Sequence, residues 1–129
     1  MRRCCHPGPV TLRCLLVDDS PQFLAAAQAL LEREGLLVVG TASHVADAVE
    51  RALELHPDVA LVDIDLGGES GFEVADRLTR SPHPIPVIMI STHGGDDYAD
   101  LIAASPAVGF LPKVTLSAGA VCDLVPACD

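Results

Sequence analysis

The sequence has few aromatic residues, few basic residues and no long apolar run. Aromatic side chains make up only 3% of the 129 residues, so leucine, valine, isoleucine and alanine must build the core. The 8 basic residues against 18 acidic ones give a net charge of −10. This charge argues against nonspecific binding to the phosphate backbone of nucleic acids. No apolar run approaches the roughly 18 residues needed to span a bilayer, so no membrane segment is expected.

Cysteines also lack an informative pattern. The chain has 5 of them, an odd number without the paired spacing of a zinc site or a redox Cys-x-x-Cys motif. Reduced thiols in a cytoplasmic protein are the expected state, and a weak metal site at Cys4-Cys5-His6 is the alternative. The segment after Arg2-Arg3 supplies no apolar stretch for a signal peptide. Residues 1–11 are therefore predicted to be a flexible tail, and residues 12–129 a single domain.

Strand-like and helix-like segments alternate along the chain. Five short apolar runs are predicted to be strands: Leu12–Val17, Leu36–Val39, Val59–Val62, Val87–Ile90 and Val108–Leu111. The predicted helices are a segment from Pro21 to Glu34 capped by Ser20, a segment capped by Ser43 that ends before Pro57, Ser70–Thr79, Asp96–Ala104, and a short Thr115–Val125. Five β-α units predict an α/β fold, with a parallel sheet covered by helices on both faces.

Polar residues follow four of the five predicted strands. Asp18-Asp19 follows the first, Asp63 ends the third, Ser91-Thr92 follows the fourth, and Lys113 comes soon after the fifth. Open α/β sheets bind ligands outside the carboxyl ends of their strands. Asp18-Asp19 alone could be a solvated turn, but the ordered set predicts one functional site.

These residues, in this order, resemble the receiver domain of two-component response regulators, from about Leu12 to Val125. The resemblance implies a doubly wound, five-stranded parallel sheet in the flavodoxin-like order 2-1-3-4-5. It also implies that Asp63 accepts a phosphoryl group from a histidine kinase or phosphotransfer protein. The domain would not be an enzyme, apart from phosphotransfer to itself and autodephosphorylation.

A carboxylate that accepts a phosphoryl group needs help, because both partners are anionic. A divalent cation gives that help, and Mg²⁺ prefers oxygen ligands. The resemblance assigns the Mg²⁺ ligands to Asp18, Asp19, Asp63 and the backbone carbonyl of Asp65. It assigns Ser91 and Lys113 to the phosphoryl oxygens, where a hydroxyl and an ammonium stabilise developing charge.

The resemblance also implies a switch. Ser91 and Phe110 would change position on phosphorylation, although Phe110 could instead be ordinary core packing. Thr92 and His93 would tune the lifetime of the phosphate. The signalling surface would be the face formed by the fourth helix, fifth strand and fifth helix, where a homodimer could also form. Because the chain ends at Asp129, output is expected to come from a separate partner protein, unless the chain is a receiver separated from a longer protein.

Two alternatives remain at this point. Asp63-Ile64-Asp65 resembles the Asp-x-Asp motif of haloacid-dehalogenase-type phosphatases, although that motif usually follows the first strand. Thr92 and Val114 occupy positions where many receivers have a small residue and a proline. The chain could therefore be a receiver-like interaction module that phosphorylation no longer controls.

Overall fold

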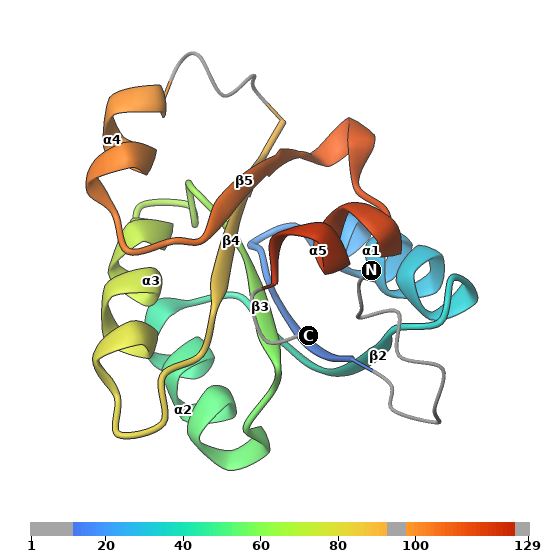
Figure 1. Cartoon of the computed structure of the whole chain (residues 1–129), viewed down its shortest axis with the longest axis horizontal. Coiled ribbons are helices and arrows are strands. Elements are labelled where there is room, and N and C mark those ends of the chain that lie inside the picture. The colour runs from blue at the N-terminus through green and yellow to red at the C-terminus, as the bar shows by residue number, and fades with distance from the viewer. Residues whose placement is uncertain (1–11, 93–97, 126–129) are drawn as a thin grey trace.

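The computed structural model describes residues 12–92 and 98–125, which form one parallel sheet flanked by helices (Figure 1). The strand order is β2-β1-β3-β4-β5, so the predicted flavodoxin-like order is confirmed. The predicted tail, residues 1–11, lies outside the described residues. Across the described ranges, none of the helices has the length and apolar character that crossing a membrane demands.

The elements follow the predicted alternation closely. The strands are β1 (Arg13–Val17), β2 (Leu37–Ala42), β3 (Val59–Asp63), β4 (Val87–Ser91) and β5 (Gly109–Pro112). The helices are α1 (Pro21–Arg33), α2 (Val45–Leu55), α3 (Gly71–Arg80), α4 (Ala99–Ala104) and α5 (Ala118–Leu124), with a short 3-10 turn η2 (Lys113–Thr115) before α5. The last helix begins at Ala118 rather than at the predicted Thr115, because Thr115 belongs to η2 and Ser117 caps the helix. The predicted start of the fourth helix at Asp96 lies outside the described residues.

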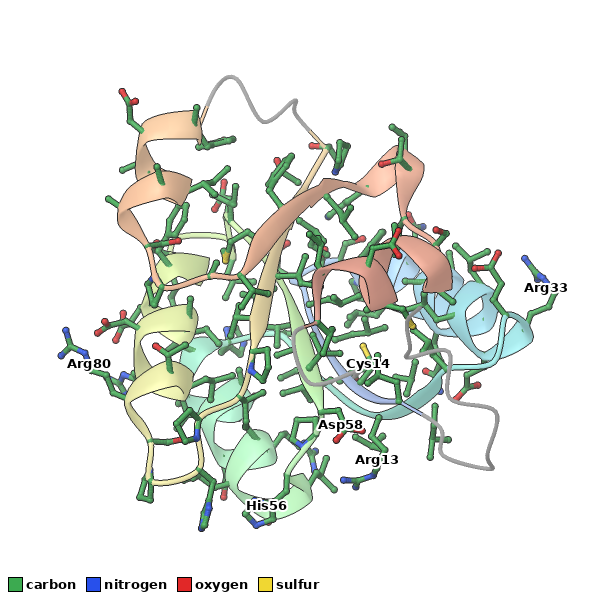
Figure 2. All side chains as sticks on the ribbon, in the orientation of Figure 1. Arg13, Cys14, Arg33, His56, Asp58 and Arg80 are labelled. Atoms are coloured by element: carbon green, nitrogen blue, oxygen red, sulfur yellow. The ribbon has the colours of Figure 1, made fainter. Side chains whose placement is uncertain are left out.

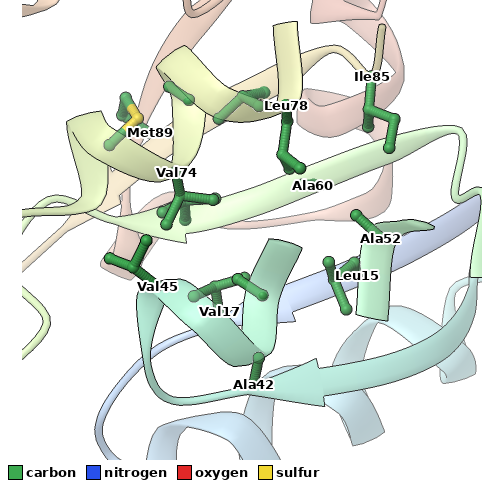
Figure 3. Close-up of a cluster of buried hydrophobic side chains, with 14 of the residues drawn as sticks. Leu15, Val17, Ala42, Val45, Ala52, Ala60, Val74, Leu78, Ile85 and Met89 are labelled. Carbon is green, nitrogen blue, oxygen red and sulfur yellow. The ribbon is translucent and has the colours of Figure 1, made fainter. Parts of the chain in front are cut away.

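Two hydrophobic clusters hold the sheet between its helices. Helices α2, α3 and α4 cover one face, and α1 and α5 cover the other (Figures 1 and 2). Neighbouring residues of a strand point to opposite faces, so β1 sends Leu15 and Val17 into the first cluster and Cys14 and Leu16 into the second. The buried members of the first cluster are aliphatic side chains and Met89 (Figure 3), and the aromatic residues that pack against them, Phe72, Tyr98 and Phe110, are only partly buried. This agrees with the low aromatic content of the sequence.

Helix starts show which caps the sequence could predict. Ser20 Oγ accepts a hydrogen bond from Phe23 N at 3.2 Å, so the predicted cap of α1 is confirmed. The predicted cap of α2 is wrong. The capping residue is His44 rather than Ser43, and its side chain makes no capping hydrogen bond. Glu69, which follows β3, takes over this role, because its Oε1 accepts from Val45 N at 2.9 Å.

Candidate phosphoacceptor site

The predicted site residues come from four neighbouring strand ends. β1, β3, β4 and β5 are adjacent and parallel, so their carboxyl ends lie at one edge of the sheet. Asp63 is the last residue of β3 and pairs in register with Ile90, one residue before Ser91. Ser91 in turn pairs with Pro112, one residue before Lys113. The register therefore brings these side chains together although they lie far apart in the sequence.

Three carboxylates form the centre of this site. Asp18 and Asp63 are buried, whereas Asp19 is exposed, and one oxygen from each lies within 4.8 Å of the others. Carboxylate oxygens are the ligands that Mg²⁺ prefers, and Mg²⁺ keeps several waters, which an open side at Asp19 permits. The donor set therefore fits the magnesium site typical of receivers.

Lys113 lies between the two buried carboxylates. Its Nζ is 2.5 Å from Asp18 Oδ2 and 3.2 Å from Asp63 Oδ2, and only 10% of its side chain is exposed. One cation thus faces three anions, and the cluster keeps a net negative charge that a divalent cation would offset.

The pKa values of this site reflect burial and crowding. Burial and the nearby Asp18 carboxylate raise the pKa of Asp63, and the ammonium of Lys113 offsets this increase only in part. Burial alone would lower the pKa of Lys113. However, its close contact with the Asp18 carboxylate and the charges of Asp63 and Asp18 outweigh burial and raise this pKa above its ordinary value. Lys113 therefore stays charged at neutral pH.

The turn after β1 and the loop after β3 hold the acidic side chains in place. Ser20 N donates to Asp18 Oδ1 at 2.8 Å, and Asp65 N lies 3.4 Å from Asp63 Oδ1. The carboxylate of Asp65 is exposed and accepts from Gly67 N at 3.0 Å. This hydrogen bond closes the turn that follows Asp65. It orients one oxygen of the Asp65 carboxylate towards the loop rather than towards Asp63.

Two glycines are required at this site, a requirement that the sequence did not reveal. A Cβ added to Gly71 would overlap the backbone oxygen of Asp63 and lie 2.9 Å from its carbonyl carbon. Gly67 has a φ of 67°, and a Cβ there would lie 2.7 Å from Asp19 Oδ2. The run of glycines after Asp63 was a signal for a loop, but only the packing shows which of them touch the site.

Of the remaining predicted residues, the structure describes Ser91, Thr92 and Phe110. Ser91 is buried at the end of β4, and Thr92 next to it is exposed. Phe110 on β5 is half-buried and packs against the cluster that α2 and α3 help to form. The predicted tuning residue His93 lies outside the described residues. The structure therefore places Ser91 at the strand end and Phe110 beside the core.

Comparison with known proteins agrees with this geometry. The family model described as the response regulator receiver domain matches residues 14–120. The protein-glutamate methylesterase/protein-glutamine glutaminase of Archaeoglobus fulgidus is 35% identical over 113 residues, which cover 88% of this chain and 32% of that protein. The DNA-binding transcriptional activator EvgA of Escherichia coli K12 is 26% identical, over 79% of this chain and 50% of that protein. The chain thus spans about a third to a half of the length of these relatives.

Solved structures show the same likeness. The receiver domain of the putative response regulator NarL from Mycobacterium tuberculosis aligns with a TM-score of 0.83 at 30% identity, covering 92% of this chain and 99% of that one. The response regulator domain of Thermotoga maritima CheB aligns with a TM-score of 0.76 at 28% identity, covering 92% and 96%. The match therefore extends over nearly the whole of each solved domain.

Proposed function

This chain belongs to the response regulator receiver domain family, and from that premise we propose that it signals by accepting a phosphoryl group on Asp63. The observation that carries the proposal is the position of Asp63. It is a buried carboxylate at a strand end, next to two more carboxylates and within 3.2 Å of an ammonium. Family membership argues against the phosphatase alternative, and Asp63 ends the third strand rather than the first.

The proposed reaction moves one phosphoryl group from a phosphohistidine to Asp63. A carboxylate oxygen of Asp63 attacks phosphorus, and an O–P bond forms as the P–N bond of the donor breaks. The histidine nitrogen leaves with the electron pair of that bond, and the product on Asp63 is an acyl phosphate. Protonated Asp63 would be a poor nucleophile, so its raised pKa makes the cation Lys113 important.

Asp18, Asp19, Asp63 and the backbone carbonyl of Asp65 are the residues that we propose to hold Mg²⁺. When bound, the ion would neutralise charge between the acceptor and the phosphoryl oxygens. Lys113 would keep its ammonium beside Asp63 and pair with the incoming phosphoryl oxygens. Ser91, buried at the neighbouring strand end, would donate a hydrogen bond to another of these oxygens.

The proposed output is a change of surface. Phosphorylated Asp63 carries roughly two negative charges where the free carboxylate carries one. Ser91 would move towards the phosphoryl oxygens, and Lys113 would pair with them from its place beside Asp63. Half-buried Phe110 would then turn inward and alter the face formed by α4, β5 and α5. That face is our proposed contact for an output protein or a second copy of this chain. We also propose that the protein is cytoplasmic and that its phosphoryl donor is a histidine kinase or phosphotransfer protein. Thr92 and His93 would tune the lifetime of the phosphate.

Intact-mass analysis after incubation with a small acyl phosphate and Mg²⁺ tests the acceptor. We expect one added phosphoryl group on the wild type, none on Asp63→Asn, and none when a chelator replaces Mg²⁺. Asp47→Asn is the matched control, because Asp47 is an exposed acid in the first turn of α2 and is not one of the three clustered carboxylates. An unchanged wild-type mass with donor and Mg²⁺ in excess would instead support an interaction module without phosphorylation.

A further inference from the structure

Lys113 has a third neighbour that the proposed chemistry does not use. Its Nζ lies over the ring of Phe23, 4.2 Å from the ring centroid. Phe23 belongs to the first turn of α1 and packs against the cluster beneath α1 and α5. Lys113 is the only lysine in the sequence, so this contact involves the single ammonium side chain of the protein. Two carboxylates and one aromatic face thus surround it.

The aromatic ring of Phe23 constrains the direction in which the Lys113 ammonium lies, which the carboxylates alone do not. Asp18 and Asp63 attract the ammonium, but opposite charges alone set a distance more strictly than a direction. The face of an aromatic ring is electronegative, and a cation over it gains most where little water competes. With 10% of its side chain exposed, Lys113 meets that condition. The Phe23 ring therefore limits the positions that the Lys113 ammonium can occupy.

The local chain path links this ring to the acidic site. Asp18 Oδ1 accepts from Ser20 N, and Ser20 Oγ accepts from Phe23 N. One turn, the connection from β1 to α1, therefore fixes both a carboxylate partner and the aromatic partner of Lys113. A shift of this turn would move both contacts together.

We propose that Phe23 is a positioning residue for phosphotransfer, because its ring face holds the Lys113 ammonium beside Asp63 before the phosphoryl group arrives. The proposal rests on the function proposed above and adds a residue outside the strand ends. A cation fixed in advance costs less reorganisation when charge develops on the phosphoryl oxygens. Phe23 would thus act on the rate of phosphotransfer through Lys113, without touching the donor.

A spectroscopic test addresses the placement without any phosphorylation. In protein labelled with ¹³C,¹⁵N-lysine, Lys113 gives the only lysine side-chain signals. A ring face beneath the ammonium should shift the ε-methylene protons upfield in the wild type and in Phe23→Tyr. Phe23→Leu, which keeps an apolar side chain but has no ring, should remove the shift. Signals at the ordinary lysine position in folded wild type would overturn the proposal.

A kinetic test separates the ring face from simple packing. Site-specific replacement of Phe23 by phenylalanines with increasing ring fluorination keeps the shape nearly constant and weakens the electronegative face. We expect the phosphorylation rate at saturating Mg²⁺ to fall in step with fluorination, by about two- to fivefold at the end of the series. The same series at Phe72, a half-buried aromatic residue of α3 that packs in the other cluster, should leave the rate unchanged.

The outcomes distinguish this proposal from the one on which it rests. A flat fluorination series at Phe23 in a protein that phosphorylates normally would overturn the role of Phe23 alone. A fall of equal size at Phe72 would also overturn it, because general packing would then explain both. A wild type that takes up no phosphoryl group would overturn the proposed function, and with it the kinetic role given to Phe23.

Discussion

At the scale of single residues, the site is defined by three neighbouring negative charges and one positive charge. The three clustered carboxylates share one ammonium, and Lys113 makes its ion pairs with the two buried acids, Asp18 and Asp63. Asp19 is the exposed member of the group and is open to water. Asp19 is therefore the acid that can become a ligand for a cation without breaking an ion pair to Lys113.

Removal of Asp19 should abolish most of the stabilisation by Mg²⁺. In the wild type, Mg²⁺ should raise the midpoint of thermal unfolding, because a ligand that binds only the folded state stabilises it. Asp19→Ala should lose most of that shift and, in chelator, unfold at a similar or higher temperature than the wild type, since it relieves like-charge crowding. Differential scanning fluorimetry with and without Mg²⁺ measures both effects, and Asp47→Ala is the control. A full Mg²⁺ response in Asp19→Ala would place the ion elsewhere.

At the scale of the elements, the junction between β3 and α3 is tightly packed. Gly71 begins α3, and its N donates to Ile64 O at 2.8 Å while its Cα faces the backbone of Asp63. The start of the helix is thus packed directly on the strand end that carries the acceptor. Glu69 from the same loop caps α2, so this loop also ties two helices together.

Substitution of Gly71 by alanine should destabilise the fold and displace the acceptor. The added Cβ would overlap backbone atoms, which cannot rotate away as a flexible side chain can. We therefore expect the free energy of unfolding to fall by about 2–4 kcal/mol. Gly119→Ala is the matched control, because nothing lies within 4 Å of its added Cβ, and helix propensity predicts a gain of about 0.5–1 kcal/mol. Urea unfolding measures both. Equal stability of Gly71→Ala and wild type would refute the close packing.

At the scale of the whole molecule, helices cover both faces of the described sheet, and β1 places a thiol, that of Cys14, in the core. Cys14 is fully buried in the cluster that α1 and α5 cover. Burial raises the pKa of the Cys14 thiol from 9.0 to about 12. The folded state therefore retains a proton that the unfolded state releases above pH 9.

This thiol predicts how the fold responds to alkaline pH. The contribution of Cys14 is complete below pH 9 and is lost between pH 9 and about 12, because only the unfolded chain gives up the proton there. We expect the free energy of unfolding to fall by up to about 1.4 kcal/mol per pH unit in this range. Urea unfolding of the reduced protein across this range measures it. Cys14→Ala should be less stable at neutral pH but show a shallower slope, and parallel slopes would contradict the prediction.

The sequence by itself determined the alternation of strands and helices along the chain, the parallel sheet and the residues at its strand ends. Apolar periodicity is local, and the carboxyl ends of adjacent parallel strands must meet, so Asp18, Asp63 and Lys113 could be expected at one place. The magnesium, switch and tuning roles came from family resemblance rather than from pattern.

Only the tertiary structure decided which distant residues touch. Glu69 replaces the predicted Ser43 as the cap of α2, Phe23 lies under Lys113, and Gly71 packs on Asp63. Two of these contacts join parts of the chain that are far apart in sequence, and the third depends on how tightly one helix packs on a strand. Their geometry follows from how helices pack on a twisted sheet, and a local pattern of residue types carries no information about that packing.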